Sequence, residues 1–155
     1  MRRVRAGKLT KPERVYLDDL AKAVVMLRHG AGLLERVRGG FGWWGSCLRC
    51  MVVGWLQWSH IHSRKVRPRS IWDPDNALAL CRRCHETWHS DPTTALEFLL
   101  RVLGQARIVR LKVRVALAPV VDKDTTRMWL EREVQRMSPE AWKMLFDGRE
   151  RSGVA

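Results

Sequence analysis

The chain has 155 residues, of which 29 are Lys or Arg and 16 are Asp or Glu, giving a formal charge of +13. A charge this large predicts a polyanionic partner, most simply nucleic acid, with a solubility role or ribosome association as the alternative. The sequence has no apolar run long enough for a membrane span, and no apolar signal segment follows the basic N-terminus. We therefore expect a cytosolic protein, whose four cysteines are more typical of metal ligands than of disulfides.

The first third of the chain is predicted to be mainly helical. Residues 1–11 form a basic arm, and residues 12–28 place apolar side chains at helical spacing before Gly30. A second, short helix is expected over residues 31–38, where a glycine-rich break follows.

The middle of the chain changes to strand and turn signals. Residues 51–62 are rich in Val, Ile and Trp and predict one or two strands with a bend at Gly54. A basic loop over residues 63–70 follows, and WDPDN at 72–76 has the composition of a turn. Residues 77–89 are expected to lead into a helix and form its first two turns.

The last third is again predicted to be helical, with one ambiguous segment. Thr93 or Thr94 can cap a helix that Gly104 closes. Residues 110–117 alternate polar and apolar side chains, which is the period of a strand, although a helix with a broad apolar face is the alternative.

Two further helices are expected towards the C-terminus. One covers residues 125–137, and Ser138-Pro139 opens another that runs to about Phe146. The positions expected to be buried in the first of these helices are Met128, Trp129, Val134 and Met137.

Two cysteine pairs with the same two-residue gap stand out: Cys47 with Cys50, and Cys81 with Cys84. This gap lets both thiolates of a pair face one ion, and two pairs complete a tetrahedral zinc site. We therefore predict a structural four-cysteine zinc. Four buried free cysteines are the alternative, but they would not explain the repeated spacing.

Two histidines directly follow the second cysteine pair. His85 and His89 are four residues apart, so on a helix they share one face and can bind a second ion. A single finger built from Cys47, Cys50 and these histidines fails, because its central gap is far longer than in such fingers. A pair of hydrogen-bonded surface histidines is the alternative.

Two more histidines, His60 and His62, follow the predicted strand segment. A histidine beside a metal-bound phosphate can act as a general base, because its pKa lies near neutral pH. A surface histidine on an edge strand is the alternative for His60.

Together these residues resemble the HNH endonuclease family, the ββα-metal nucleases, in the phage and bacterial branch that adds a four-cysteine zinc site. The resemblance covers residues 43–92. The motif residues in chain order are Cys47, Cys50, Ser59, His60, Asn76, Cys81, Cys84, His85 and His89.

The resemblance implies a role for each of these residues. His60 would be the general base that activates water, and Asn76 would hold the loop that positions it. His85 and His89 would bind one catalytic divalent ion, which could be Mg²⁺, Mn²⁺, Ni²⁺ or Zn²⁺. Many members carry a metal ligand where this chain has Ser59, which favours a Mg²⁺-like ion held partly by water.

Contacts with DNA are expected from basic residues next to these motifs, because Lys and Arg bind phosphates without reading sequence. A solvated charged loop is the alternative. Five of the tryptophans (Trp43, Trp55, Trp58, Trp72 and Trp88) are expected to pack a small core rather than stack on bases. The predicted DNA-binding residues are Arg64, Lys65, Arg67, Arg69, Arg82 and Arg83.

The sequence therefore predicts an α+β fold with a ββα-metal (HNH) core over residues 43–92. A basic arm and helical region at 1–42, a mainly helical region at 93–148 and a tail at 149–155 would flank it. The function implied is metal-dependent hydrolysis of DNA phosphodiesters in a bacterial host cytoplasm. The alternatives are a non-catalytic zinc-stabilised DNA-binding module and a branched-DNA recombination nuclease. Duplex or branched DNA, a homodimer and a phage packaging terminase are the partners compatible with the resemblance.

Overall fold

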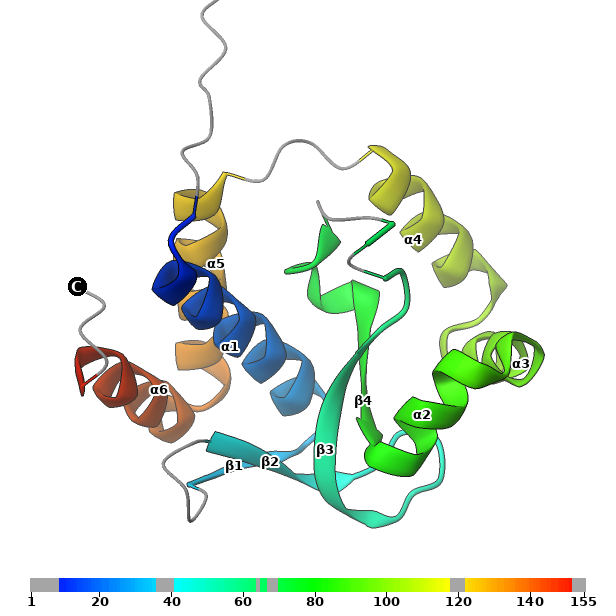
Figure 1. Ribbon diagram of the computed structural model, residues 1–155, viewed down its shortest axis with the longest axis horizontal. Coiled ribbons are helices and arrows are strands. Elements are labelled where there is room, and N and C mark those ends of the chain that lie inside the picture. Colours follow the sequence, from blue (N-terminus) through cyan, green and yellow to red (C-terminus); the bar gives the residue numbers. More distant parts are fainter. Residues whose placement is uncertain (1–8, 36–40, 64, 67–69, 118–121, 152–155) are drawn as a thin grey trace, which may run out of the picture.

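The protein has an α+β fold in which helices surround a small antiparallel sheet (Figure 1). A computed structural model describes residues 9–35, 41–63, 65–66, 70–117 and 122–151. The described residues contain six α-helices and one four-stranded sheet. None of these helices combines the length and apolarity that a membrane crossing needs.

The sheet is a meander in which each strand pairs antiparallel with the next, in the order β1-β2-β3-β4. Strand β4 is buried throughout its ALAL sequence, because α1 contacts it as well as α2. The strands are β1 Gly32–Glu35, β2 Phe41–Ser46, β3 Val53–His60 and β4 Ala77–Cys81. A short 3₁₀ helix, η2 (Pro74–Asn76), precedes β4, as the turn composition of WDPDN predicts.

Helix α1 (Lys11–Arg28) is the central helix and confirms the first predicted helix. Thr10 and Glu13 form a reciprocal capping box at its start, which satisfies backbone N–H groups that the first turn leaves unpaired. Its buried side includes Leu20 and Val24, which are fully excluded from solvent. It packs on β3 and β4 and on helices α5 and α6.

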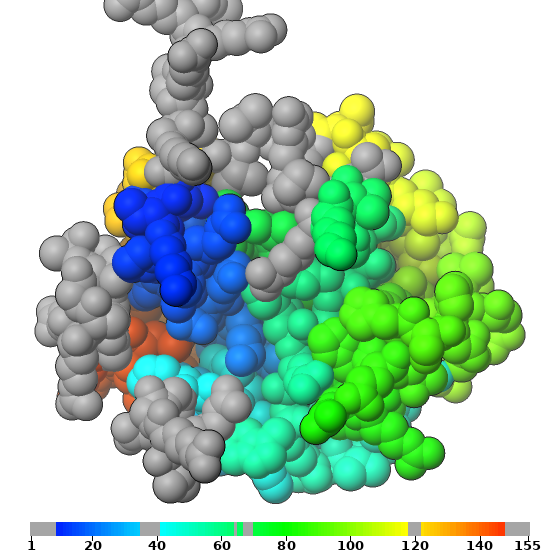
Figure 2. Space-filling view, in the orientation of Figure 1, coloured from blue at the N-terminus to red at the C-terminus, as the bar shows by residue number. Residues whose placement is uncertain are grey.

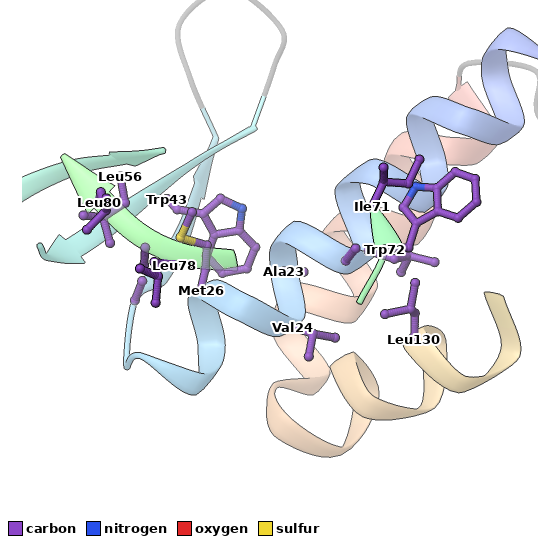
Figure 3. Close-up of a cluster of buried hydrophobic side chains, with 14 of the residues drawn as sticks. Ala23, Val24, Met26, Trp43, Leu56, Ile71, Trp72, Leu78, Leu80 and Leu130 are labelled. Atoms are coloured by element: carbon purple, nitrogen blue, oxygen red, sulfur yellow. The ribbon is translucent and has the colours of Figure 1, made fainter. Parts of the chain in front are cut away.

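The hydrophobic core joins the sheet to the C-terminal helices through α1 (Figure 3). Met26 of α1 lies beside Trp43 and Leu78 at the sheet, while Val24 faces Leu130 of α5. Residues from the N-terminal, central and C-terminal segments therefore share one hydrophobic cluster.

The short helix predicted over residues 31–38 is wrong where the structure describes it, because Gly32–Glu35 form strand β1. Leu33 pairs with Trp43 of β2 and packs against the core, whereas Leu34 faces outward. A run of four residues is too short for periodicity to distinguish a strand from a helix.

The strand predicted over residues 110–117 is also wrong, and the helical alternative is correct. These residues belong to α4 (Gln105–Leu117), which buries Ile108, Leu111 and Val115 at helical spacing. Val113, which the alternating pattern placed with the core, is 53 % exposed. The alternation arose because this helix also carries apolar residues on its outer side.

The remaining helices agree with the sequence in position but not in every buried residue. Asp91, rather than Thr93 or Thr94, caps α3, and Gly104 ends it with a positive φ. In α5, Val134 is buried as predicted, but Met128 is 65 % exposed and Trp129 is 43 % exposed, and Leu130 occupies the core instead. The helices are α2 Arg82–Ser90, α3 Pro92–Leu103, α4 Gln105–Leu117, α5 Lys123–Met137 and α6 Pro139–Arg151.

Candidate metal centres

The four cysteines come together at one corner of the sheet. Cys47 and Cys50 lie in the loop between β2 and β3, while Cys81 ends β4 and Cys84 lies in the first turn of α2. Their sulfur atoms all lie within 4.8 Å of one another. The cysteines form the one group of three or more His, Cys, Asp or Glu ligands found in the described residues.

The spacing of the sulfur atoms suits a tetrahedral zinc ion. Four sulfurs about 2.3 Å from one zinc lie about 3.8 Å apart at tetrahedral angles. The Cys50 and Cys81 sulfurs are 3.8 Å apart. The cluster is therefore compatible with a structural zinc, as the paired spacing predicts.

The backbone around the cluster favours the ionised form of one cysteine, Cys47. Burial opposes ionisation of Cys47, but the backbone N–H groups of Cys50, Cys81 and Arg49 lower its pKa to about 7. Burial raises the pKa of Cys84, and the neighbouring thiols raise it further. A bound cation would instead lower the pKa of the Cys84 thiol, because coordination favours the thiolate.

A tight turn shapes the first cysteine pair. The N–H of Met51 donates to the Cys47 carbonyl at 2.9 Å, and the N–H of Cys47 donates to the Val52 carbonyl at 3.0 Å. Met51 adopts a left-handed conformation with φ of 61°, which is unusual for a residue other than glycine. The spacing of the cysteines does not reveal this strained position.

His85 and His89 form a second pair, on α2. Their Nε2 atoms are 3.0 Å apart. Two nitrogens about 2.0–2.1 Å from one ion lie about 2.8–3.4 Å apart at octahedral or tetrahedral angles, so the distance is compatible with a shared ion. It is equally the length of a hydrogen bond between the two rings. Burial, and then the neighbouring His89, lower the pKa of His85, which favours the neutral ring that can bind a metal.

Gln57 orients this pair, and sequence reasoning missed it. Its Oε1 atom lies 2.7 Å from Nδ1 of His85. An amide oxygen only accepts, so Nδ1 carries the proton and Nε2 presents its lone pair towards His89. Gln57 lies two residues before Ser59 on β3, so the two share one face of the strand. That spacing is the signal that could have found it.

Ser59 is the one motif position with an unexplained buried group. Its side chain is 1 % exposed, and its hydroxyl has no hydrogen-bond partner within the described part of the chain. Buried polar groups are nearly always paired. This orphan hydroxyl lies on the same strand face as Gln57, the residue that contacts His85.

His60, at the end of β3, is held by hydrogen bonds from two directions. Its Nε2 lies 3.0 Å from the Ile71 carbonyl, so in the neutral ring Nε2 carries the proton and Nδ1 the lone pair. The Trp88 indole of α2 donates to the His60 carbonyl at 3.2 Å, which ties this strand end to the helix of the histidine pair. The His60 ring itself packs on Trp58, with centroids 4.2 Å apart.

Asn76 is fully buried and joins the two ends of the β3–β4 connection. Its Oδ1 accepts the His62 N–H at 2.8 Å, and its Nδ2 lies 3.1 Å from the His62 carbonyl and 3.2 Å from the Ser70 carbonyl. Its own carbonyl accepts the Ile61 N–H at 2.8 Å. These hydrogen bonds connect the end of β3 to the turn before β4.

Arginines hold the turn before Asn76 from outside. Arg114 of α4 contacts Asp73 at 3.0 Å and Asp75 at 2.8 Å, while Arg28 contacts Asp75 at 2.9 Å. Burial opposes ionisation of Asp75, but these arginines lower its pKa. Sequence reasoning did not predict that α4 contacts this turn.

The predicted DNA-contacting residues are described only in part. Arg64, Arg67 and Arg69 lie outside the described residues. Lys65, Arg82 and Arg83 are exposed, and Arg82 forms an ion pair with Glu86 one helical turn away.

The β3 end and α2 lie side by side, with α3 beyond (Figure 2). Trp88 stacks edge-to-face on Phe98 of α3, with centroids 6.2 Å apart, which fixes α2 against α3. Trp43, Trp72 and Trp88 are buried as expected, whereas Trp55 is 47 % exposed, so its predicted core position is wrong.

The structure thus brings the four cysteines together in one cluster, and His85 and His89 together with Gln57 in another. Of the other motif residues, Ser59 and His60 end β3 and Asn76 ends η2. Comparison with protein-family models, curated proteins and solved structures gave no match.

Proposed function

We propose that this chain is a metal-dependent endonuclease of the HNH type that hydrolyses DNA phosphodiester bonds. The observation that carries the proposal is the His85–His89 pair, with Nε2 atoms 3.0 Å apart and His85 oriented by Gln57. A pair of adventitious surface histidines would not need a partly buried amide to fix the ring tautomer. The order of β3, β4 and α2, two paired strands followed by a helix, supports the proposal.

In this proposal the four cysteines hold a structural zinc, and His85 and His89 hold one catalytic divalent ion. When bound, that ion supplies positive charge to the scissile phosphate and the leaving oxygen. The two sites are separate, because the four cysteines form a ligand group that includes neither His85 nor His89 among the described residues.

His60 is the proposed general base. The Ile71 carbonyl keeps the proton on Nε2, so Nδ1 is the atom that takes a proton from the attacking water. Asn76 keeps the Ile71 loop in place through its bonds to Ser70 and His62. The net charge of +13 supplies attraction for the phosphate backbone.

The test is a cleavage panel of linear, supercoiled, single-stranded and branched DNA in Mg²⁺, Mn²⁺, Ni²⁺ and Zn²⁺. We expect the wild type to cut at least one substrate and His60→Ala to lose at least about 100-fold in rate, the usual lower size of a general-base contribution. His62→Ala is the matched control, because its bonds to Asn76 come from the backbone and survive the change.

A zinc-stabilised DNA-binding module is the second candidate. It is favoured by the fact that no third His, Cys, Asp or Glu joins His85 and His89 in a ligand group among the described residues. DNA binding without cleavage of any substrate in any of the four metals would select this candidate. Equal cleavage by His60→Ala and wild type would reject His60 as the base.

A further inference from the structure

The outer face of the sheet carries a cluster of exposed apolar side chains. In β2 and β3, Trp43 and Leu56 are paired and buried, so alternation turns their neighbours Trp44 and Trp55 outward. Trp44 is 42 % exposed and Trp55 is 47 % exposed. The exposed members of this outer patch are Leu34, Trp44, Val53 and Trp55, which share one face of the sheet by alternation.

The two tryptophans form a defined surface. Trp44 and Trp55 are directly opposite each other in the register, and their rings meet edge-to-face with centroids 5.2 Å apart. Each ring therefore limits the motion of the other, and the pair presents aromatic surface to solvent at little further entropic cost.

The outer patch continues into the candidate catalytic site. Trp55 and Gln57 are two residues apart on β3, so they share a face and lie about 7 Å apart along the strand. Gln57 in turn contacts His85. A nucleic-acid strand with a phosphate at the histidine pair would therefore pass beside Trp55.

The charge next to the outer patch is positive. Cys81 pairs with Leu56, the neighbour of Trp55, and Arg82 and Arg83 follow it directly. Both arginines are exposed, and Glu86 pairs with Arg82. Aromatic surface bordered by arginine in a chain of charge +13 is complementary to a polyanion with accessible ring faces.

We propose that Trp44 and Trp55 form a stacking platform for the unpaired bases of single-stranded DNA that leads into the candidate cleavage site. This inference rests on the proposed nuclease function and defines the substrate class. Duplex DNA exposes phosphates and base edges but keeps its base faces stacked, so it cannot use the two rings in this way. Unpaired bases can, and they do so with little dependence on sequence.

The test compares binding of a fluorescent 30-nucleotide oligo-dT strand and of a 30-base-pair duplex by the full-length, zinc-loaded protein without added catalytic metal. We expect the double variant Trp44→Ala/Trp55→Ala to lose at least about fivefold in affinity for oligo-dT, the lower limit for one base stacked on an aromatic ring. Its affinity for the duplex should change less than twofold.

Three control variants separate stacking from folding and from charge. Trp44→Phe/Trp55→Phe keeps both ring faces and should retain most of the binding to oligo-dT. Trp129→Ala removes a tryptophan on α5 with 43 % exposure and should bind as the wild type does. Arg82→Gln/Arg83→Gln should weaken both DNA forms alike and reduce the salt dependence of binding.

Unchanged oligo-dT binding by a folded alanine double variant would overturn the platform. A wild-type dimer that the same variant converts to a monomer, with oligo-dT binding retained, would assign the outer patch to self-association instead. The proposed function fails separately: a wild type that cuts no DNA but binds oligo-dT through Trp44 and Trp55 would keep the platform and reject the nuclease.

Discussion

Asn76 and the backbone of His62 are joined by two hydrogen bonds in opposite directions, at 2.8 and 3.1 Å. Backbone pairing between β3 and β4 ends at His60 and Ala77, and beyond that point the Asn76 side-chain amide makes the connection instead. The strand end that carries His60 and the turn that starts β4 are fixed to each other at this point.

Replacing Asn76 should destabilise the fold strongly. Asn76→Ala leaves the His62 N–H and the Ser70 carbonyl without their buried partner, so we expect a loss of about 2–4 kcal/mol in the free energy of unfolding. Urea unfolding followed by tryptophan fluorescence measures this loss. Gln135→Ala, an exposed position on α5, is the control and should change stability by less than about 0.5 kcal/mol. A loss at Asn76 no larger than at Gln135 would contradict the structural role.

Gln57→Leu should weaken binding of the second ion without affecting the cysteine site. The change removes the acceptor that fixes the His85 tautomer, and loss of such an outer partner typically costs about 10–100-fold in metal affinity. Calorimetric titration of zinc-loaded protein with Mn²⁺ measures the affinity. Gln57→Glu keeps an acceptor oxygen and should retain the affinity. Equal Mn²⁺ affinities in Gln57→Leu and wild type would reject the orienting role.

Cys81→Ser should release zinc and unfold the corner of the sheet, because a structural zinc supplies folding free energy. Zinc content by elemental analysis and secondary structure by circular dichroism measure the effect. Chelation should unfold the wild type in the same way, and added zinc should refold the wild type but not the variant. A zinc-free variant with unchanged circular dichroism and melting temperature would show that the cysteines are not needed for folding.

Arg114→Gln should loosen the turn that precedes Asn76. The variant loses the ion pairs of α4 to Asp73 and Asp75, and we expect a loss of about 1 kcal/mol at low salt, since the arginine is half exposed. The loss should shrink in 1 M NaCl, where exposed charges are screened. Arg110→Gln, an exposed neighbour on α4, is the control. A loss that is the same at both salt concentrations would mean that packing, rather than charge, explains it.

The Glu13 carboxylate should contribute stability that depends on pH. Bonds from the Thr10 backbone, then from Lys123 of α5, lower its pKa to about 2 from its ordinary value of 4.5. The folded state therefore holds the proton less tightly than the unfolded state, so the contribution is complete above about pH 5 and declines as pH falls towards 2. The difference in melting temperature between wild type and Glu13→Gln should be smaller at pH 4 than at pH 7. A larger difference at pH 4 would reverse the assigned sign.

The predictions from sequence held where a local rule acts on a long or strongly marked segment. Helix α1 has both a capping box and a long apolar stripe, and Gly104 ends α3 where a glycine was expected to. They failed at Gly32–Glu35, where the segment is too short to show a period, and at residues 110–117, where the helix carries apolar residues on both its inner and outer sides. Trp55 was misplaced for a related reason, since a tryptophan in a strand can pack inward or outward with the same sequence.

The sequence by itself determined the cysteine pairing, the spacing of His85 and His89 on one helix face, and the turn that ends in Asn76, because each depends on residues close together in the chain. Only the tertiary structure decided that Gln57 orients His85 and that Arg114 reaches Asp73 across 41 positions. It also decided that Trp44 and Trp55 share an exposed face of the sheet, on the strand that carries Gln57. Such contacts depend on strand register and on how the helices pack. Burial of the whole hydrophobic core determines both, so a short stretch of sequence does not predict them.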